Sequence, residues 1–163
     1  MKVRGVLLQL LAQRKTRSLS RWVNLWPPFL GAGIRVIHIA TDMKAVDVEM
    51  KLRWWNANYV GTQFGGSLFA MTDAFYMLML MANLGGDYIV WDKAASIRYR
   101  KPGKGTVRAE FRLSESQIDD IREKLQRLPK YEPTFLVEVK DESGVVIAEV
   151  EKLLHVRRKQ DHR

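Results

Sequence analysis

Residues 67–84, SLFAMTDAFYMLMLMANL, decide the fold of this chain. The segment is apolar on every helical face and is followed directly by Gly85 and Gly86. A helix of this kind lies either in a protein core or across a membrane. A membrane span needs about 20 apolar residues and disfavours a central charge by roughly 2.5–3.5 kcal/mol. This segment has 18 residues and contains Asp73, so we predict a buried central helix.

The sequence on both sides of this segment alternates between apolar and polar residues, which predicts antiparallel strands. The alternation is clearest over 45–52 and 106–113, and is weaker over 34–40, 88–100, 134–140 and 145–156. One apolar stripe over 116–128 predicts a second, short helix. This order is typical of an α+β fold in which a curved antiparallel sheet wraps around one central apolar helix. The prediction includes an extra N-terminal helix and the short inserted helix.

Composition and charge limit the function classes. The 163 residues include no cysteine, and 47% are apolar, which excludes a disordered chain, a disulfide scaffold and thiolate chemistry. The net charge of +9 comes from the two ends, because the 109 residues over 42–150 contain 15 basic and 16 acidic residues. We divide the chain into a basic amphipathic helix over 1–28, which packs on the domain, and a single domain over 29–163.

The basic ends raise the question of a polyanionic partner. No basic strand with interleaved aromatics and no helix-turn-helix pattern is present, so we expect no nucleic-acid partner. The apolar run over 5–12 is followed by basic residues rather than by a cleavage site for secretion, which favours a cytoplasmic protein. The N-terminal segment without acidic residues also resembles a mitochondrial transit peptide, so the mitochondrial matrix is the alternative location. Contact with an anionic membrane surface is the alternative to packing on the domain, without a membrane span.

Several common kinds of active site are excluded. The three histidines fit no zinc pattern, and neither a nucleophile elbow nor a phosphate-binding loop is present, so we expect no metal. The remaining motif is NYVGTQFGG over 58–66, which precedes the central helix and Asp73. Paired glycines at a helix N-terminus expose backbone N–H groups that suit an oxyanion. A lone carboxylate in an apolar helix needs hydrogen bonds, protonation or a water-filled cleft, and a purely structural aspartate is the alternative.

This arrangement resembles the hotdog-fold thioesterase superfamily. The matching residues are Asn58, Gly61-Thr62, Gly65-Gly66, Asp73 and the strand end Arg98-Tyr-Arg100-Lys101-Pro102-Gly103. Trp26-Pro27-Pro28, the segment DYIVWDK over 87–93 and the inserted helix are similar to its DUF4442 branch. The resemblance covers about residues 22–156. It implies a hotdog fold and pairing of two subunits sheet to sheet, as a homodimer or a dimer of dimers, with active sites at the interface.

The resemblance also implies a mechanism. The backbone N–H of Gly66 would polarise the thioester carbonyl, and Asp73 would act as nucleophile or general base, often from the opposite subunit. Asn58 would orient the water or the thioester. A thioester is an activated acyl group, so a carboxylate and an oxyanion site suffice without cysteine or histidine. We therefore expect an acyl-CoA hydrolase, with coenzyme A as part of the substrate and no other cofactor.

The expected substrate contacts lie on both sides of the glycine pair. They are Thr62, Gln63, Phe64 and Gly65 for the thioester region, and Arg98, Arg100, Lys101 and Lys104 for the coenzyme A phosphates. An ordinary solvated hairpin is the alternative for the four basic residues. Many relatives have histidine where this chain has Phe64. A module that binds acyl-CoA or lipid without turnover is therefore the alternative function.

Overall fold

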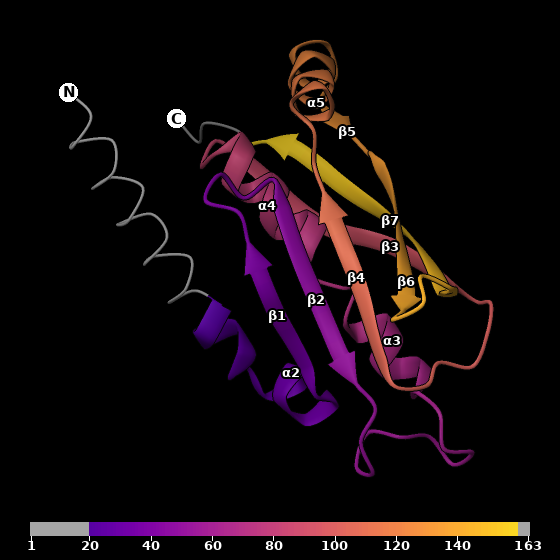
Figure 1. Cartoon of the computed structure of the whole chain (residues 1–163). Helices are drawn as coiled ribbons and strands as arrows, with labels where there is room; N and C mark the ends of the chain where they lie inside the picture. The colour runs from indigo at the N-terminus through magenta and orange to yellow at the C-terminus, as the bar shows by residue number, and fades with distance from the viewer. Residues whose placement is uncertain (1–19, 160–163) are drawn as a thin grey trace.

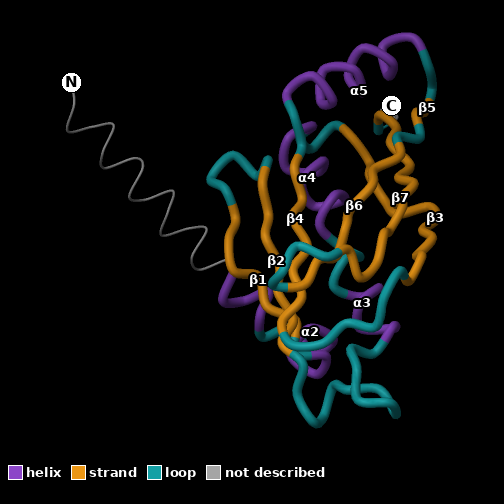
Figure 2. The backbone as a smooth tube through the Cα atoms, turned by 45° about the vertical axis from the view of Figure 1, so that its right-hand side comes forward, coloured by secondary structure: helices purple, strands orange, loops and turns teal. Residues whose placement is uncertain are grey.

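The computed structural model describes residues 20–159, which form one antiparallel sheet around a central helical segment. The helical segment, α3 (Gly65–Ala70) and α4 (Phe75–Leu84), lies on one face of the sheet (Figure 1, Figure 2). This is the hotdog arrangement that the sequence predicted. In spatial order the strands are β1 (Ile34–Ile39), β2 (Ala45–Lys51), β4 (Thr106–Arg112), β6 (Thr134–Asp141), β7 (Val146–Arg158) and β3 (Tyr88–Tyr99), with β5 (Lys130–Tyr131) beside β7.

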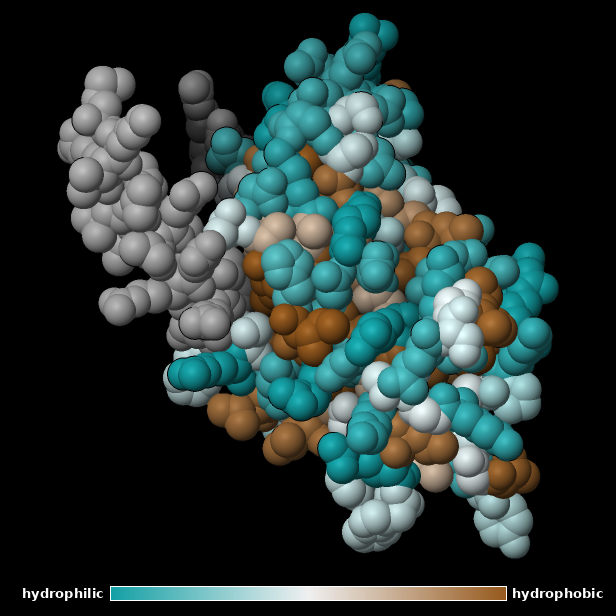
Figure 3. Space-filling view, in the orientation of Figure 1, coloured by the Kyte–Doolittle hydropathy of each residue, from teal (hydrophilic) through white to brown (hydrophobic). Residues whose placement is uncertain are grey.

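The two faces of the sheet differ because successive residues of a strand point to opposite sides. Val48 of β2 and Ala109 of β4 are directly paired, and both are fully buried against the helical segment. The neighbouring residues on the outer face are charged, and Asp47 forms an ion pair with Arg112. Figure 3 shows this outer face, where hydrophilic side chains predominate. The alternation predicted for these two strands is thus confirmed.

The central helical segment is interrupted, whereas the sequence predicted one continuous helix. Residues 71–74 form turns, and the backbone N–H of Asp73 donates to Ala70 O, three residues back rather than four. The Thr72 hydroxyl donates to Phe69 O at 2.8 Å. A threonine side chain that bonds the preceding turn competes with the regular helical pattern. The interruption places Asp73 between two helices.

The span Gly65–Leu84 meets the length and composition criteria for a membrane-crossing helix. Core helices of wrapped sheets meet the same criteria, and Met79 and Leu80 in this span are fully buried under the sheet. The other side of α4 is less covered, since Leu78 and Met81 are exposed. The prediction of a buried central helix is therefore correct for its sheet-facing side only.

The N-terminal region contributes a short helix, α2 (Pro27–Ala32), that leads into β1. Proline occupies its first turn, and Gly33 ends it with a φ of 75° that favours glycine. Most of the amphipathic helix predicted over 1–28 lies outside the described residues. An apolar groove of about 510 Å³ runs between residues 22–29 and the start of α4, lined by Trp22, Val23, Leu25, Trp26, Phe29, Ala74, Phe75, Met77 and Leu78.

The inserted helix α5 (Glu115–Arg127) lies at the opposite end of the molecule from α3 (Figure 1). Ser114 and Gln117 form a capping box at its start, which satisfies otherwise unpaired N–H groups. Its apolar stripe buries Ile118, Ile121 and Leu125. The short helix predicted over 116–128 is confirmed.

The pairing of β3 with β7 contains a β-bulge between Asp92 and Ala94 that changes which β3 residues face inward. Before the bulge Asp92 pairs with Leu154, and after it Ala95 pairs with Lys152. Directly paired residues lie on the same face of a sheet. A bulge inserts one residue and so reverses the alternation. Asp92, which precedes the bulge, therefore shares the inner face with Leu154 and with Lys152, two residues away in β7.

Glu132 organises an ion cluster beside β5. Its carboxylate accepts from Lys93 Nζ at 2.6 Å and from Lys130 Nζ at 3.3 Å, and it contacts His155 Nδ1 at 3.0 Å. The hydrogen bonds from Lys93 and then from His155 lower the pKa of Glu132 to about 2. The His155 ring also stacks on Trp91 at 4.0 Å between centroids. The cluster thus ties the segment before β6 to β3 and β7.

We expect Glu132→Gln to reduce the sensitivity of the fold to acid. The pKa of this carboxyl is about 2 in the folded state and 4.5 as its ordinary value. A lowered folded-state pKa stabilises the fold above pH 4.5, and this contribution is lost as the pH falls from 4.5 to about 2. Urea midpoints over this range should fall more steeply for the wild type than for Glu132→Gln. Glu142→Gln is the matched control, and identical slopes for wild type and Glu132→Gln would contradict the prediction.

Candidate functional site

The loop that precedes α3 is shaped by Asn58. Its Nδ2 donates to Thr62 Oγ1 at 2.8 Å and to Gln63 O at 3.3 Å. Its Oδ1 accepts from the backbone N–H groups of Val60 and Thr62. These four bonds use the whole hydrogen-bonding capacity of the amide. Asn58 therefore fixes the loop, and orienting a water or a thioester would require it to exchange one of these bonds.

Gln63 joins this loop to the turn between β3 and β4. Its backbone N–H donates to Gly103 O at 2.9 Å, and its Nε2 donates to Met50 O and Gly105 O. The side chain is buried, and its Oε1 has no hydrogen-bond partner among residues 20–159. Gln63 thus holds two segments together that are about 40 residues apart in sequence.

A cleft of about 420 Å³ opens between these two segments. The structure brings six of the predicted site residues to its walls: Asn58, Thr62, Gln63, Gly65, Arg100 and Lys101. The other lining residues are Val60, Leu68, Tyr99, Pro102 and Gly103. Five predicted residues do not line it, namely Phe64, Gly66, Asp73, Arg98 and Lys104.

The glycine pair begins α3 beside two aromatic rings. The Tyr99 hydroxyl donates to Gly65 O at 3.0 Å, and a Cβ at Gly65 would lie 2.9 Å from that hydroxyl oxygen. A Cβ at Gly66 would lie 2.5 Å from Cε1 of Phe64, so the phenyl ring occupies the space beside Gly66. No side chain caps α3, whose first N–H groups have no partner within the helix. Tyr99 is a cleft residue that sequence reasoning missed, although it lies between Arg98 and Arg100 in the strand end that carries the family resemblance.

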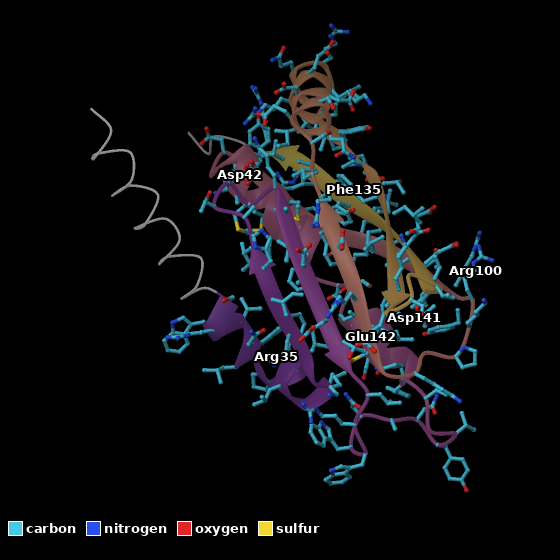
Figure 4. All side chains as sticks on the ribbon, in the orientation of Figure 1. Arg35, Asp42, Arg100, Phe135, Asp141 and Glu142 are labelled. Carbon is cyan, nitrogen blue, oxygen red and sulfur yellow. The ribbon has the colours of Figure 1, made fainter. Side chains whose placement is uncertain are left out.

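The four basic residues expected to meet phosphates do not form one cluster. Arg100 Nη2 lies 2.6 Å from Glu149 Oε2 and holds the pKa of that carboxyl below its ordinary value. Figure 4 shows Arg100 extending from the rim beyond the end of β3. Arg98 lies opposite Glu149 in the β3–β7 pairing. Within the described part of the chain, no carboxylate pairs with Lys101 or Lys104, so these ammonium groups are available to a ligand.

Asp73 differs from its predicted setting. The sequence predicted a lone carboxylate inside an apolar helix, but Asp73 stands in the interruption between α3 and α4, and its side chain is 58% exposed. It also has a partner, because Oδ1 accepts from Lys152 Nζ at 2.9 Å. Its second oxygen, Oδ2, makes no hydrogen bond within residues 20–159. The cost of an unpaired buried charge is thus avoided.

Lys152 is a second residue of the candidate site that sequence reasoning missed. Its side chain is 1% exposed, and Nζ also lies 3.1 Å from Asp92 Oδ1. Burial raises the pKa of Asp92, and the hydrogen bond and positive charge of Lys152 act against that rise. The sequence does contain a signal, because Val150 and Leu154 are core residues in the same phase of the strand. A lysine at an inward-facing position of such a strand is rare unless it is paired.

The site as a whole therefore has two parts: the cleft and the charged cluster of Asp73, Lys152 and Asp92. No group of three or more histidine and acidic side chains over residues 20–159 has the arrangement of a metal site. The cluster offers an accessible carboxylate beside a fixed positive charge. The cleft offers polar backbone groups, a glycine, the unpaired ammonium group of Lys101 and the guanidinium group of Arg100 at its rim. Such groups suit proton abstraction and the binding of a phosphorylated ligand.

Solved structures with the same architecture include one thioesterase and one probable thioesterase. A Pseudomonas aeruginosa protein of unknown function, described as a probable thioesterase, is 25% identical, with a TM-score of 0.69 over 78% of this chain and 85% of that chain. A Haemophilus influenzae thioesterase is 13% identical, with a TM-score of 0.65 over 91% of this chain and 94% of that chain. The PaaI protein of Escherichia coli, from the phenylacetic acid degradation operon, is 14% identical, with a TM-score of 0.58 over 86% and 89%.

These similarities confirm the thioesterase-like hotdog fold. A search of curated proteins finds no match to the sequence. The model of a family described as a domain of unknown function, DUF4442, matches residues 15–156. That match covers the sheet, the central helical segment and the inserted helix. The chain therefore belongs to the DUF4442 family.

Proposed function

We propose that this protein hydrolyses acyl thioesters, with acyl-CoA as the substrate class. The observation that carries the proposal is the Asp73 carboxylate, accessible to a ligand and held by the buried Lys152 in a fold shared with thioesterases. A carboxylate that is accessible on one side and fixed on the other can serve as a general base. The cleft beside Gly65 supplies a place for the rest of the ligand.

The reaction needs few groups. Asp73 removes a proton from a water, whose oxygen bonds to the thioester carbon while the carbonyl becomes an oxyanion. The backbone N–H of Gly66 stabilises that oxyanion. The carbon–sulfur bond then breaks, and the thiolate of coenzyme A leaves and takes up the proton held by Asp73. In the alternative with Asp73 as nucleophile, its carboxylate oxygen bonds to the thioester carbon, the carbon–sulfur bond breaks and the thiolate of coenzyme A leaves, and water then hydrolyses the acyl anhydride.

We propose that two subunits complete the site. Asp73 does not line the cleft of its own chain, which supports a site that combines Asp73 of one subunit with the glycine pair of the other. β3 is 12 residues long and stands at the end of the sheet, where it pairs with β7 on one side only. Such an exposed edge is a ready surface for pairing with another chain. A homodimer or a dimer of dimers satisfies both features.

One observation favours the alternative function, an acyl-CoA or lipid-binding module without turnover. The Phe64 ring lies against Gly66, beside the N–H that would stabilise the oxyanion. An apolar ring there offers no hydrogen bond to a thioester. In this alternative the ligand binds in the same cleft, but no thiol is released.

We expect Asp73→Asn to abolish most of the thiol release while ligand binding is retained. Loss of a general base lowers a rate by about 10²- to 10⁴-fold. The measurement is thiol release from saturated acyl-CoAs of two to eighteen carbons, with binding followed separately by calorimetry. Asp87→Asn is the matched control, because Asp87 is an exposed aspartate distant from the cleft. Equal rates for wild type and Asp73→Asn would exclude Asp73 as the base, and binding without release by the wild type would select the alternative.

We expect a Lys101→Ala and Lys104→Ala double variant to bind the nucleotide part of the substrate more weakly. Two exposed ion pairs contribute up to about 1 kcal/mol each, so KM for acyl-CoA should rise about fivefold or more. KM for the matching N-acetylcysteamine thioester, which has no phosphates, should stay unchanged. Lys159→Ala serves as the control. An equal rise in KM for both substrates would show that these lysines do not bind the phosphates.

A further inference from the structure

Lys152 is costly for the fold, and nothing in the packing requires it. Its neighbours in the same phase of β7, Val150 and Leu154, are fully buried and apolar. Removing an ammonium group from water carries a penalty of several kcal/mol that ion pairing only offsets. Replacement of buried ion pairs by apolar residues is often neutral or stabilising. An apolar residue at 152 would therefore serve the core at least as well.

The surroundings of Lys152 come from three separate parts of the fold. Asp73 Oδ1 approaches from the interruption of the central helix at 2.9 Å, and Asp92 Oδ1 approaches from β3 at 3.1 Å. The ring centroid of Phe69, at the end of α3, lies 5.9 Å from Nζ. Asp92 stands just before the bulge in β3 and pairs with Leu154, two residues from Lys152 in β7. Two local irregularities thus converge on one ammonium group.

The two carboxylates are not equivalent. The side chain of Asp73 is 58% exposed, whereas that of Asp92 is 23% exposed. One ammonium between two carboxylates leaves one net negative charge in the cluster. Asp92 is the inner counterion, and Asp73 is the outer one whose Oδ2 is free to meet a ligand. The arrangement fixes one oxygen of Asp73 and presents the other.

We propose that Lys152 is a positioning residue of the active site, which orients Asp73 through its ion pair, with Asp92 as the counterion that anchors the ammonium group. This inference rests on the proposed function, because it assigns a role toward the carboxylate that acts on the thioester. Lys152 itself does not contact the substrate in this account. It acts through Asp73.

The arrangement predicts shifts of opposite sign in two variants. The charged groups that the described structure places against Asp73 are Lys152 from β7 and Asp92 from β3, and the Phe69 ring from α3 is neutral. Lys152→Met leaves two neighbouring carboxylates without a cation, which favours protonation. Asp92→Asn leaves the cation to Asp73 alone, which favours ionisation. A merely structural role would not produce opposite shifts.

The test measures kcat/KM against pH for the wild type, Lys152→Met and Asp92→Asn. We expect the acidic limb to move up by about one pH unit or more in Lys152→Met, and down in Asp92→Asn. Lys93→Met is the matched control, because Lys93 belongs to the Glu132 cluster and not to this one. Its acidic limb should coincide with that of the wild type. If Lys152→Met does not fold, the downward shift of the acidic limb in Asp92→Asn still tests the proposal, and its absence would overturn it.

A second readout separates this proposal from the proposed function. The titration midpoint of Asp73 can be followed by ¹³C NMR of its side-chain carboxyl, with Asp73→Asn identifying the signal. Opposite midpoint shifts in the two variants, together with matching shifts in the rate profile, support the proposal. The role of Lys152 would be overturned, with the proposed function intact, if hydrolysis needs Asp73 but the acidic limb of the kcat/KM profile is the same in all variants. Opposite midpoint shifts in a protein that hydrolyses no acyl-CoA would overturn the proposed function and, with it, the positioning role.

Discussion

A charged ammonium group inside an apolar core constrains the rest of this structure. Lys152 points toward the central helical segment and must meet carboxylates there, because a buried charge without partners is far too costly. Asp73 and Asp92 meet it from two directions. Asp73 stands in the interruption of the central helix, and Asp92 faces inward just before the bulge in β3. Both carboxylates thus lie beside an irregularity in an otherwise regular element.

The cleft is built by a different principle, which relies on hydrogen bonds rather than charge. Asn58 uses its whole amide to shape the loop, and Gln63 attaches that loop to the turn after β3. Tyr99 then approaches Gly65 so closely that a larger residue there would collide with it. A rigid loop of this kind holds its backbone groups in place before a ligand arrives. Gly65 and Lys101, from the two segments, consequently face a preformed cleft.

The fold could be predicted from the sequence because alternation and helical stripes report burial directly. Val48 and Ala109 lie where their strands' alternation places them, and Ile121 lies on the buried stripe of α5. The setting of Asp73 could not be predicted in this way, since its partner stands 79 residues further along the chain. Asp73 meets that partner at an interruption of the central helix, which leaves no periodic signal in the sequence. The residue types in the sequence were enough to identify the candidate carboxylate and glycines. Only the folded structure shows which side chains contact them and fix their positions.

The central claim is that the Asp73 carboxylate, held by Lys152, faces the thioester carbon. The most direct measurement is a crystal structure with a non-hydrolysable acyl-CoA analogue in which a methylene group replaces the thioester carbonyl. We expect a water within hydrogen-bond distance of Oδ2 of an Asp73 and about 3–3.5 Å from this methylene, with the phosphates near Lys101. An analogue bound in the cleft with its thioether remote from Asp73 of either subunit would contradict the account.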